Sequence, residues 1–91
     1  MKILQTNLFK KSLKTLHANQ KKTLDDVIRS IIENPLIGAQ KDLANVYVYK
    51  FRMIDQLTLL AYIYDSENAS ITLLALGAHE NFYRDLKNHI N

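Results

Sequence analysis

Apolar and polar residues follow two different periods along the chain, and the change of period separates a helical part from a strand part. Before residue 40, apolar residues recur every three or four positions, the spacing that one face of an α-helix requires. From residue 46 onward they come in short runs rich in β-branched and aromatic side chains, which is typical of strands. The pattern therefore predicts an α+β fold in which two helices precede most of the sheet.

The first helix is predicted to follow a short strand over Lys2–Gln5, with Asn7 or Thr6 as its N-cap. Asn19-Gln20 is a polar break, and His17 is expected to end the first helix. Asn34-Pro35 stops the second helix, and a loop continues through Gly38. Together the helices are expected to form an antiparallel hairpin. Their predicted inward residues are Phe9, Leu13 and Leu16 in the first helix, and Leu24, Val27, Ile28, Ile31 and Ile32 in the second.

Three strands are predicted over residues 46–52, 57–64 and 70–76, joined by turns at 53–56 and 65–68. Because these connections are short, the strands should form an antiparallel meander. Runs that are apolar on both faces imply a sheet covered by the helices on one side and partly covered on the other. A last helix is expected over residues 80–89, with Phe82, Leu86 and Ile90 facing inward.

Length and composition fit a single domain spanning residues 1–91 with ordinary globular content. There is no cysteine, so neither disulfides nor thiolate metal sites can support the fold. The apolar stretch before Lys10 is too short for a signal peptide or a membrane span, so a cytoplasmic protein that does not enter membranes is expected.

The formal net charge is only +3, but the cations are clustered. Basic clusters attract nucleic-acid phosphate, acidic proteins or anionic lipid headgroups, although a lysine-rich helix face can also be simply solvated. The first cluster precedes any acidic residue and comprises Lys10, Lys11, Lys14, Lys21 and Lys22; Lys50 with Arg52 and Arg84 with Lys87 form two more.

Candidate chemistry centres on Lys50, Arg52, His79 and Tyr83. Strand alternation puts Lys50 and Arg52 on the face opposite to the neighbouring aromatic residues. His79 follows a buried strand, and Tyr83 is four residues further on, so the two would share one side of the last helix. Imidazole transfers protons near neutral pH, and paired cations suit a phosphodiester. Ordinary structural roles compete with this interpretation: His79 as a cap or packing residue, and the cations as protection of a strand edge.

Cleavage of RNA requires a base for the 2′-hydroxyl proton, an acid for the leaving 5′-oxygen and cations for the phosphate. None of these roles needs a metal ion, and the sequence has none of the carboxylate or histidine clusters that a metal site uses. The sequence therefore predicts neither a metal nor any other cofactor.

The segment from Gly77 to Lys87 resembles the C-terminal end of the bacterial RelE/ParE family, the toxic halves of type II toxin–antitoxin pairs. It is most similar to the YafQ-like branch, in which His79 matches the catalytic histidine and Tyr83 the following aromatic residue. The pattern Tyr49-Lys50-Phe51-Arg52 is similar to the strand that carries catalytic cations in RelE-like ribonucleases. Arg52 stands where the YafQ-like branch has a second histidine, and the arginine of RelE on the next strand is replaced by apolar residues and Thr58.

The resemblance implies an endoribonuclease that cuts mRNA on the ribosome, with His79 as acid or base and Tyr83 assisting. Lys50, Arg52 and Arg84 would hold phosphate, while Lys10, Lys11 and Lys14 would contact nucleic acid. It equally admits a ParE-like toxin that inhibits DNA gyrase without nuclease activity, and more weakly a toxin acting directly on DNA. All three would have a cognate antitoxin with an acidic, partly disordered segment. A small nucleic-acid-binding or adaptor domain that is no toxin remains the other alternative.

Overall fold

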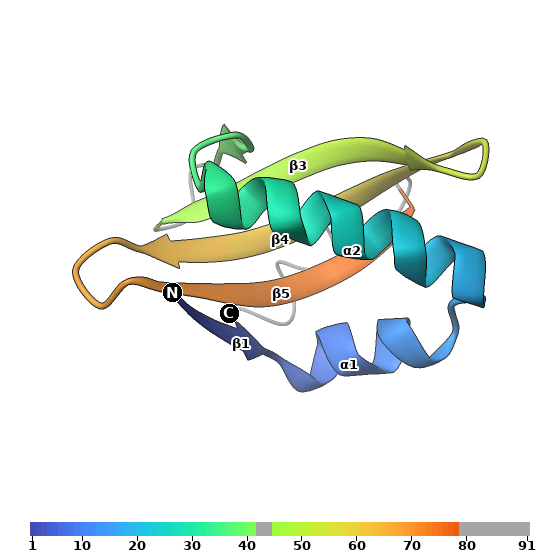
Figure 1. The fold of residues 1–91 in the computed structure, drawn as a ribbon, viewed down its shortest axis with the longest axis horizontal. Coiled ribbons are helices and arrows are strands. Elements are labelled where there is room, and N and C mark those ends of the chain that lie inside the picture. Colours follow the sequence, from blue (N-terminus) through green and yellow to red (C-terminus); the bar gives the residue numbers. More distant parts are fainter. Residues whose placement is uncertain (42–44, 79–91) are drawn as a thin grey trace.

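The computed structural model describes residues 1–41 and 45–78, which form one five-stranded sheet and two helices (Figure 1). The strand order is β1-β5-β4-β3-β2, with β1 parallel to β5 and every other pair antiparallel. The predicted meander is confirmed as β3, β4 and β5, whereas the predicted helix over 80–89 lies outside the described residues. The elements are β1 Lys2–Gln5, α1 Asn7–Lys14, α2 Ala18–Glu33, β2 Ala39–Gln40, β3 Val46–Met53, β4 Gln56–Asp65 and β5 Ser70–Ala78.

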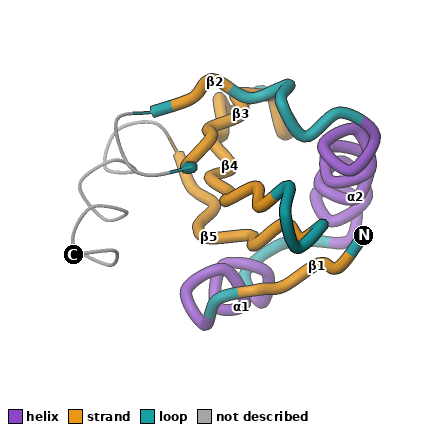
Figure 2. Tube along the Cα trace, turned by 90° about the vertical axis from the view of Figure 1, so that its left-hand side faces the viewer, coloured by secondary structure: helices purple, strands orange, loops and turns teal. Residues whose placement is uncertain are grey.

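The two helices run in opposite directions, as predicted, but they occupy different places on the sheet (Figures 1 and 2). Helix α2 crosses one face, while α1 lies along β5 at the edge of the sheet, beyond the end of β1. Consecutive residues of α1 therefore pack on different sides: Phe9 belongs to the apolar cluster under α2, and Leu8 packs against the cluster of the other face. None of the described helices is long and apolar enough to cross a membrane.

The boundary between the helices differs from the prediction. Thr6 is the N-cap of α1, and its hydroxyl accepts a hydrogen bond from the Phe9 backbone N–H at 3.0 Å. His17 does not end α1 but is the N-cap of α2, and its backbone N–H donates to Gln20 Oε1 at 2.8 Å. The predicted break at Asn19-Gln20 is thus wrong, because these polar side chains lie in the first turn of α2. Ile32, predicted to face inward, is exposed at the end of that helix.

Both faces of the sheet carry a buried apolar cluster. The cluster under the helices combines Phe9, Leu24 and Ile31 of α1 and α2 with residues of three strands. Tyr47, Tyr49 and Phe51 of β3 pack against it, as the strand alternation predicts. The second cluster lies on the opposite face and consists of Val46, Val48, Leu59, Ala61, Leu74 and Ala75.

A β-bulge in β5 shifts the alternation of its side chains by one residue. Ala61 pairs with Ala75 and Tyr62 with Leu73, so Leu74 is an extra residue without a partner in β4. Its carbonyl accepts a hydrogen bond of 2.6 Å from the Thr6 hydroxyl, which satisfies a buried acceptor. Beyond the bulge, Leu76 returns to the helix-covered face.

Tyr62 of β4 fixes the loop that follows α2. Its ring is fully buried and stacks on Tyr47, with ring centroids 5.5 Å apart. Its hydroxyl donates to the Pro35 carbonyl at 2.7 Å and accepts from the Gly38 N–H at 3.0 Å. A Cβ on Gly38 would lie 2.8 Å from this hydroxyl, so the close approach requires glycine. The anchored loop leads into β2, a two-residue strand that was not predicted.

Candidate functional site

Lys50 and Arg52 lie on the face of β3 that points away from α2. Both side chains are exposed, whereas Tyr49 and Phe51 between and beside them pack toward the helices. The two residues are one alternation apart on the same strand, so their side chains emerge side by side about 6.5–7 Å apart. Within the described residues neither cation has a carboxylate partner. Both remain available for an anion.

The neighbouring strands extend this surface toward the end of β5. Lys50 pairs with Leu59 of β4, and Leu59 pairs with Gly77 of β5. Strands in a sheet are about 4.8 Å apart, so Gly77 lies roughly 10 Å from Lys50 across the same row. Gly77 is partly exposed and carries no side chain, and Leu59 between it and Lys50 is fully buried. The predicted general acid or base, His79, follows two residues later in the sequence.

Three of the predicted site residues, His79, Tyr83 and Arg84, lie outside the described residues. Their roles, and the prediction that His79 and the β3 cations face a common hollow, stay predictions. The described residues contribute one half of the predicted site, the cation pair Lys50 and Arg52.

The β3–β4 hairpin lies at the end of the sheet next to Arg52. Its turn has a left-handed backbone that the sequence did not reveal. Ile54 and Asp55 form its two-residue turn and have φ values of 47° and 59°. Such left-handed positions favour glycine or asparagine, and a β-branched residue there stores roughly 1–3 kcal/mol of strain. The Asp55 carbonyl accepts a hydrogen bond from Arg52 Nη1 at 3.4 Å, which draws the guanidinium toward the turn.

Leu57 completes this corner of the sheet. It pairs directly with Arg52 across β3 and β4 and is 39% exposed. Side chains paired in this way have Cβ atoms about 5 Å apart, so an apolar group flanks the guanidinium. Leu57 therefore contributes an exposed apolar side chain to the surface next to Arg52.

The lysines of α1 form a separate basic surface. Lys10, Lys11 and Lys14 are all exposed on α1, which leaves them free to meet a polyanion. Lys14 also lines a hollow of about 300 Å³ between the two helices, together with Leu13, Lys21 and Asp25. The described structure therefore presents two basic regions, one on β3 and one on the helices.

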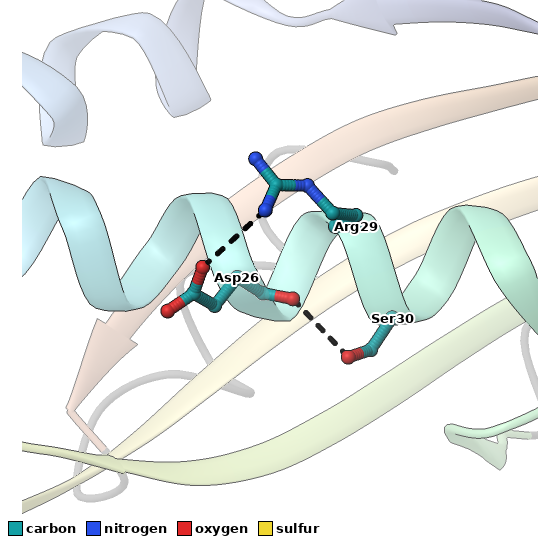
Figure 3. A network of polar contacts seen from close by, with 3 residues as sticks. All are labelled: Asp26, Arg29 and Ser30. Carbon is teal, nitrogen blue, oxygen red and sulfur yellow. Dashed lines mark hydrogen bonds and ion pairs between the residues drawn. The ribbon is translucent and has the colours of Figure 1, made fainter.

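Arg29 of α2 illustrates a cation with a local partner (Figure 3). Its Nη1 lies 3.7 Å from Asp26 Oδ1, and the Asp26 carbonyl accepts a hydrogen bond from the Ser30 hydroxyl at 3.1 Å. Both charged side chains are largely exposed, so the pair adds little stability. Arg29 is thus a suitable control position for the cations of β3.

A smaller, uncharged hollow of about 130 Å³ lies on the helix-covered side, where β5 ends. Ser12 and Leu76 border it, and the Ser12 hydroxyl donates to the Leu76 carbonyl at 3.1 Å. Sequence reasoning did not identify this hollow, because its residues come from five helices and strands and from the turn between the helices. Among the described residues no group of three or more His, Cys, Asp or Glu side chains could hold a metal ion.

Comparison with known proteins identifies the class to which this fold belongs. Residues 3–87 match the family model described as the ParE-like toxin of type II bacterial toxin–antitoxin systems. The chain therefore belongs to this family, within the RelE/ParE superfamily of toxins. No curated protein matches it at a comparable level.

Solved structures of Escherichia coli RelE share the fold. A doubly substituted RelE in the free state has a TM-score of 0.79 and 18% identity, covering 99% of this chain and 97% of that chain. The isolated RelE toxin has a TM-score of 0.74 and 17% identity, with coverage of 99% and 98%. The intact RelBE toxin–antitoxin complex has a TM-score of 0.75 and 17% identity, with coverage of 87% and 96%. The predicted α+β architecture is thus confirmed for the described elements.

Proposed function

We propose that this toxin inhibits translation by metal-independent endoribonucleolytic cleavage of mRNA on the ribosome. The observation that carries the proposal is the pair of exposed cations, Lys50 and Arg52, on the sheet face opposite the helices. A buried aromatic face anchors the strand, so the cations project from a rigid element rather than from a loop. In the sheet register Lys50 is in line with Leu59 and Gly77, and His79 follows Gly77 by two residues in the sequence.

RNA cleavage needs acid–base groups and phosphate-binding cations, and different residues are proposed for the two roles. A base removes the proton from the ribose 2′-hydroxyl, the 2′-oxygen attacks phosphorus, and the bond to the 5′-oxygen breaks as an acid protonates that oxygen. His79 is proposed as the acid or base, with Tyr83 assisting or stacking on a base. Lys50, Arg52 and Arg84 would bind the phosphate and neutralise the negative charge that increases on its oxygens in the transition state.

The exposed lysines Lys10, Lys11 and Lys14 are proposed to hold the toxin on nucleic acid. Their contacts would be to phosphate and independent of base sequence. Each lost phosphate contact should reduce the slope of log affinity against log salt by about 0.7–0.9. The salt dependence of binding by single Lys→Ala variants measures this directly.

The decisive experiment compares matched variants in a cell-free translation reaction with end-mapping of the mRNA. Lys50→Ala/Arg52→Ala should reduce cleavage by about 10²-fold or more, since each transition-state donor commonly contributes that much. His79→Ala should reduce it at least tenfold. Arg29→Ala removes an exposed cation elsewhere and should leave cleavage within about twofold of the unsubstituted protein. Full cleavage by a folded double variant would remove the β3 cations from the mechanism.

Gyrase inhibition is the second candidate, and Leu57 favours it. This exposed apolar residue is paired with Arg52, and the start of its strand, with apolar residues and Thr58, departs from the RelE pattern, which has an arginine there. Exposed aliphatic groups beside an arginine suit a protein target better than RNA. A supercoiling assay run beside the translation assay separates the two: loss of supercoiling with intact mRNA would establish the gyrase function instead.

A cognate antitoxin is proposed as the partner. RelE has been crystallised as the intact RelBE complex and with an antitoxin RelBc peptide. An exposed basic surface like that of this chain would attract an acidic segment that folds on binding. Expression of the chain alone should arrest growth, and co-expression of the product of the adjoining gene should restore it. Unimpaired growth during strong expression of the soluble chain would refute every toxin function.

A further inference from the structure

The tip of the β3–β4 hairpin has an isoleucine where both the backbone conformation and the exposure to water disfavour it. Ile54 adopts a left-handed conformation that disfavours β-branched side chains, and it is 53% exposed. Asparagine or glycine would suit this turn better and would leave no apolar group in water. Ile54 is therefore not the residue that this turn favours, and local departures of this kind are expected where a side chain serves function.

The neighbours of Ile54 define the chemistry that this tip can recognise. Leu57 lies across from Arg52, and the Arg52 guanidinium is bonded to the turn through the Asp55 carbonyl. Leu57 is thus paired with Arg52, Ile54 belongs to the turn to which the Arg52 guanidinium is bonded, and Lys50 lies one alternation further along β3. We refer to Ile54, Leu57 and Arg52 as the hairpin patch.

We propose that the hairpin patch is a docking site for an acidic polypeptide segment. An apolar side chain of the partner would pack on Ile54 and Leu57, and an adjacent carboxylate would pair with Arg52. Arginine beside apolar surface suits a protein interface, whereas single-stranded RNA is bound mainly by aromatic stacking and cations. The positive charge of Arg52 and Lys50 selects an acidic segment.

The choice of partner rests on the proposed toxin function, because the antitoxin is the acidic protein expected in the same cell. Docking at this site would also compete with the binding of phosphate. A carboxylate on Arg52 would occupy the same guanidinium that the proposed cleavage uses for phosphate. One contact at the hairpin tip would thus bind the partner and remove a cation from the nucleic-acid surface.

The test is a set of affinity measurements on purified proteins. The probes are the product of the adjoining gene and a short synthetic peptide with Glu and Leu at helical spacing; a Lys/Leu peptide is the charge control. Ile54→Asn and Leu57→Thr should each weaken binding of both acidic probes by about tenfold or more, as expected for central apolar anchors. Ile54→Asn should raise the thermal midpoint, because asparagine suits the turn, so weaker binding could not be blamed on unfolding.

Two matched controls separate the patch from general effects. Ala69→Asn makes the same kind of change at a position with φ 49° in the β4–β5 turn, at the other end of the ten-residue strand β4, roughly 30 Å away. Leu36→Asn removes an apolar side chain that is 62% exposed in the loop after α2. Both should bind the acidic probes within about twofold of the unsubstituted protein.

Three results would overturn the docking proposal: failure of the unsubstituted chain to bind either acidic probe, equal affinities across all variants, or an Ile54→Asn protein that keeps its affinity but loses RNA cleavage. The last result would make the tip a nucleic-acid contact. Absence of mRNA cleavage by the unsubstituted toxin would refute the proposed function alone, since the affinity comparison does not require catalysis.

Discussion

Tyr62→Phe isolates the role of one buried hydroxyl. The substitution keeps the ring that stacks on Tyr47 and removes the donor to the Pro35 carbonyl and the acceptor for the Gly38 N–H. The side chain is fully buried, so no packing volume is lost beyond the oxygen itself. What changes is the attachment of the loop after α2 to the centre of the sheet.

The expected cost follows from these two hydrogen bonds. Each contributes about 0.5–1.5 kcal/mol net, and buried groups left without partners cost about 1–3 kcal/mol. Leu36 and Ile37 in the loop are exposed, so water can reach the freed backbone groups and reduce the penalty. We expect Tyr62→Phe to lower the free energy of unfolding by about 1–2 kcal/mol. For a domain of this size that corresponds to a fall in Tm of roughly 4–16 °C.

Urea denaturation followed by circular dichroism measures this change, with Tyr49→Phe as the matched control. The Tyr49 ring stacks on Phe51, but its hydroxyl has no hydrogen-bond partner within the described residues. Its removal should therefore change stability by no more than about 0.5 kcal/mol. Equal stability of the Tyr62→Phe protein and the unsubstituted protein would show that the hydroxyl does not fix the loop.

The pH dependence of stability provides a second comparison between the unsubstituted protein and Tyr62→Phe. Burial raises the pKa of the Tyr62 phenol, while the Gly38 N–H opposes the shift. A pKa above the unfolded value means that the neutral phenol stabilises the fold below about pH 10. That stability is lost as pH rises through the folded-state pKa, so the advantage over Tyr62→Phe should be constant near neutrality and shrink in strong alkali.

Three further predictions concern other parts of the fold. Thr6→Ala should cost about 1–2 kcal/mol in urea denaturation, since it removes the cap of α1 and the bond to the Leu74 carbonyl; Thr6→Ser should restore most of it. Hydrogen bonds from the Asn68 side chain and backbone, and from the Glu67 N–H, lower the pKa of Asp65. Its stabilising effect is present above the unfolded value of about 4 and lost as pH falls through the folded pKa, so Asp65→Ala should show a shallower loss of Tm in acid. Leu57→Arg puts a second guanidinium beside Arg52 and should increase mRNA cleavage in the translation reaction if the toxin is a ribonuclease; unchanged or lower cleavage would count against that function.

The sequence predicted the elements whose patterns are long and regular. The apolar spacing of α2 and the alternation of Lys50 and Arg52 with aromatic residues follow from periodicity alone, and both are confirmed in the structure except at Ile32. The start of α2 was mispredicted because Asn19 and Gln20 are polar in a loop and at a helix N-terminus alike. Only the bond between His17 and Gln20 distinguishes the two, and composition does not reveal it.

Other features depend on contacts between distant residues. Strand β2 has two residues, and it forms because Tyr62 holds the preceding loop against the sheet. The return of Leu76 to the helix-covered face depends on the bulge at Leu74, which a strict two-residue period cannot anticipate. The strain at Ile54 is likewise invisible in the sequence, since nothing local marks the residue as part of a two-residue turn.

The parallel pairing of β1 with β5 limits the order in which the strands of the sheet can fold. Ile3 pairs with Ile71, and the Thr6 hydroxyl donates a hydrogen bond to the Leu74 carbonyl in the bulge, so the first strand has no partner in the sheet until β5 has been synthesised. Contacts of such long sequence separation form late and slow folding. A nascent chain on its ribosome would therefore hold β1 and α1 unattached while the meander is still emerging. Docking of the first strand would therefore be a late step of folding, which gives a partner time to engage the chain before the sheet is complete.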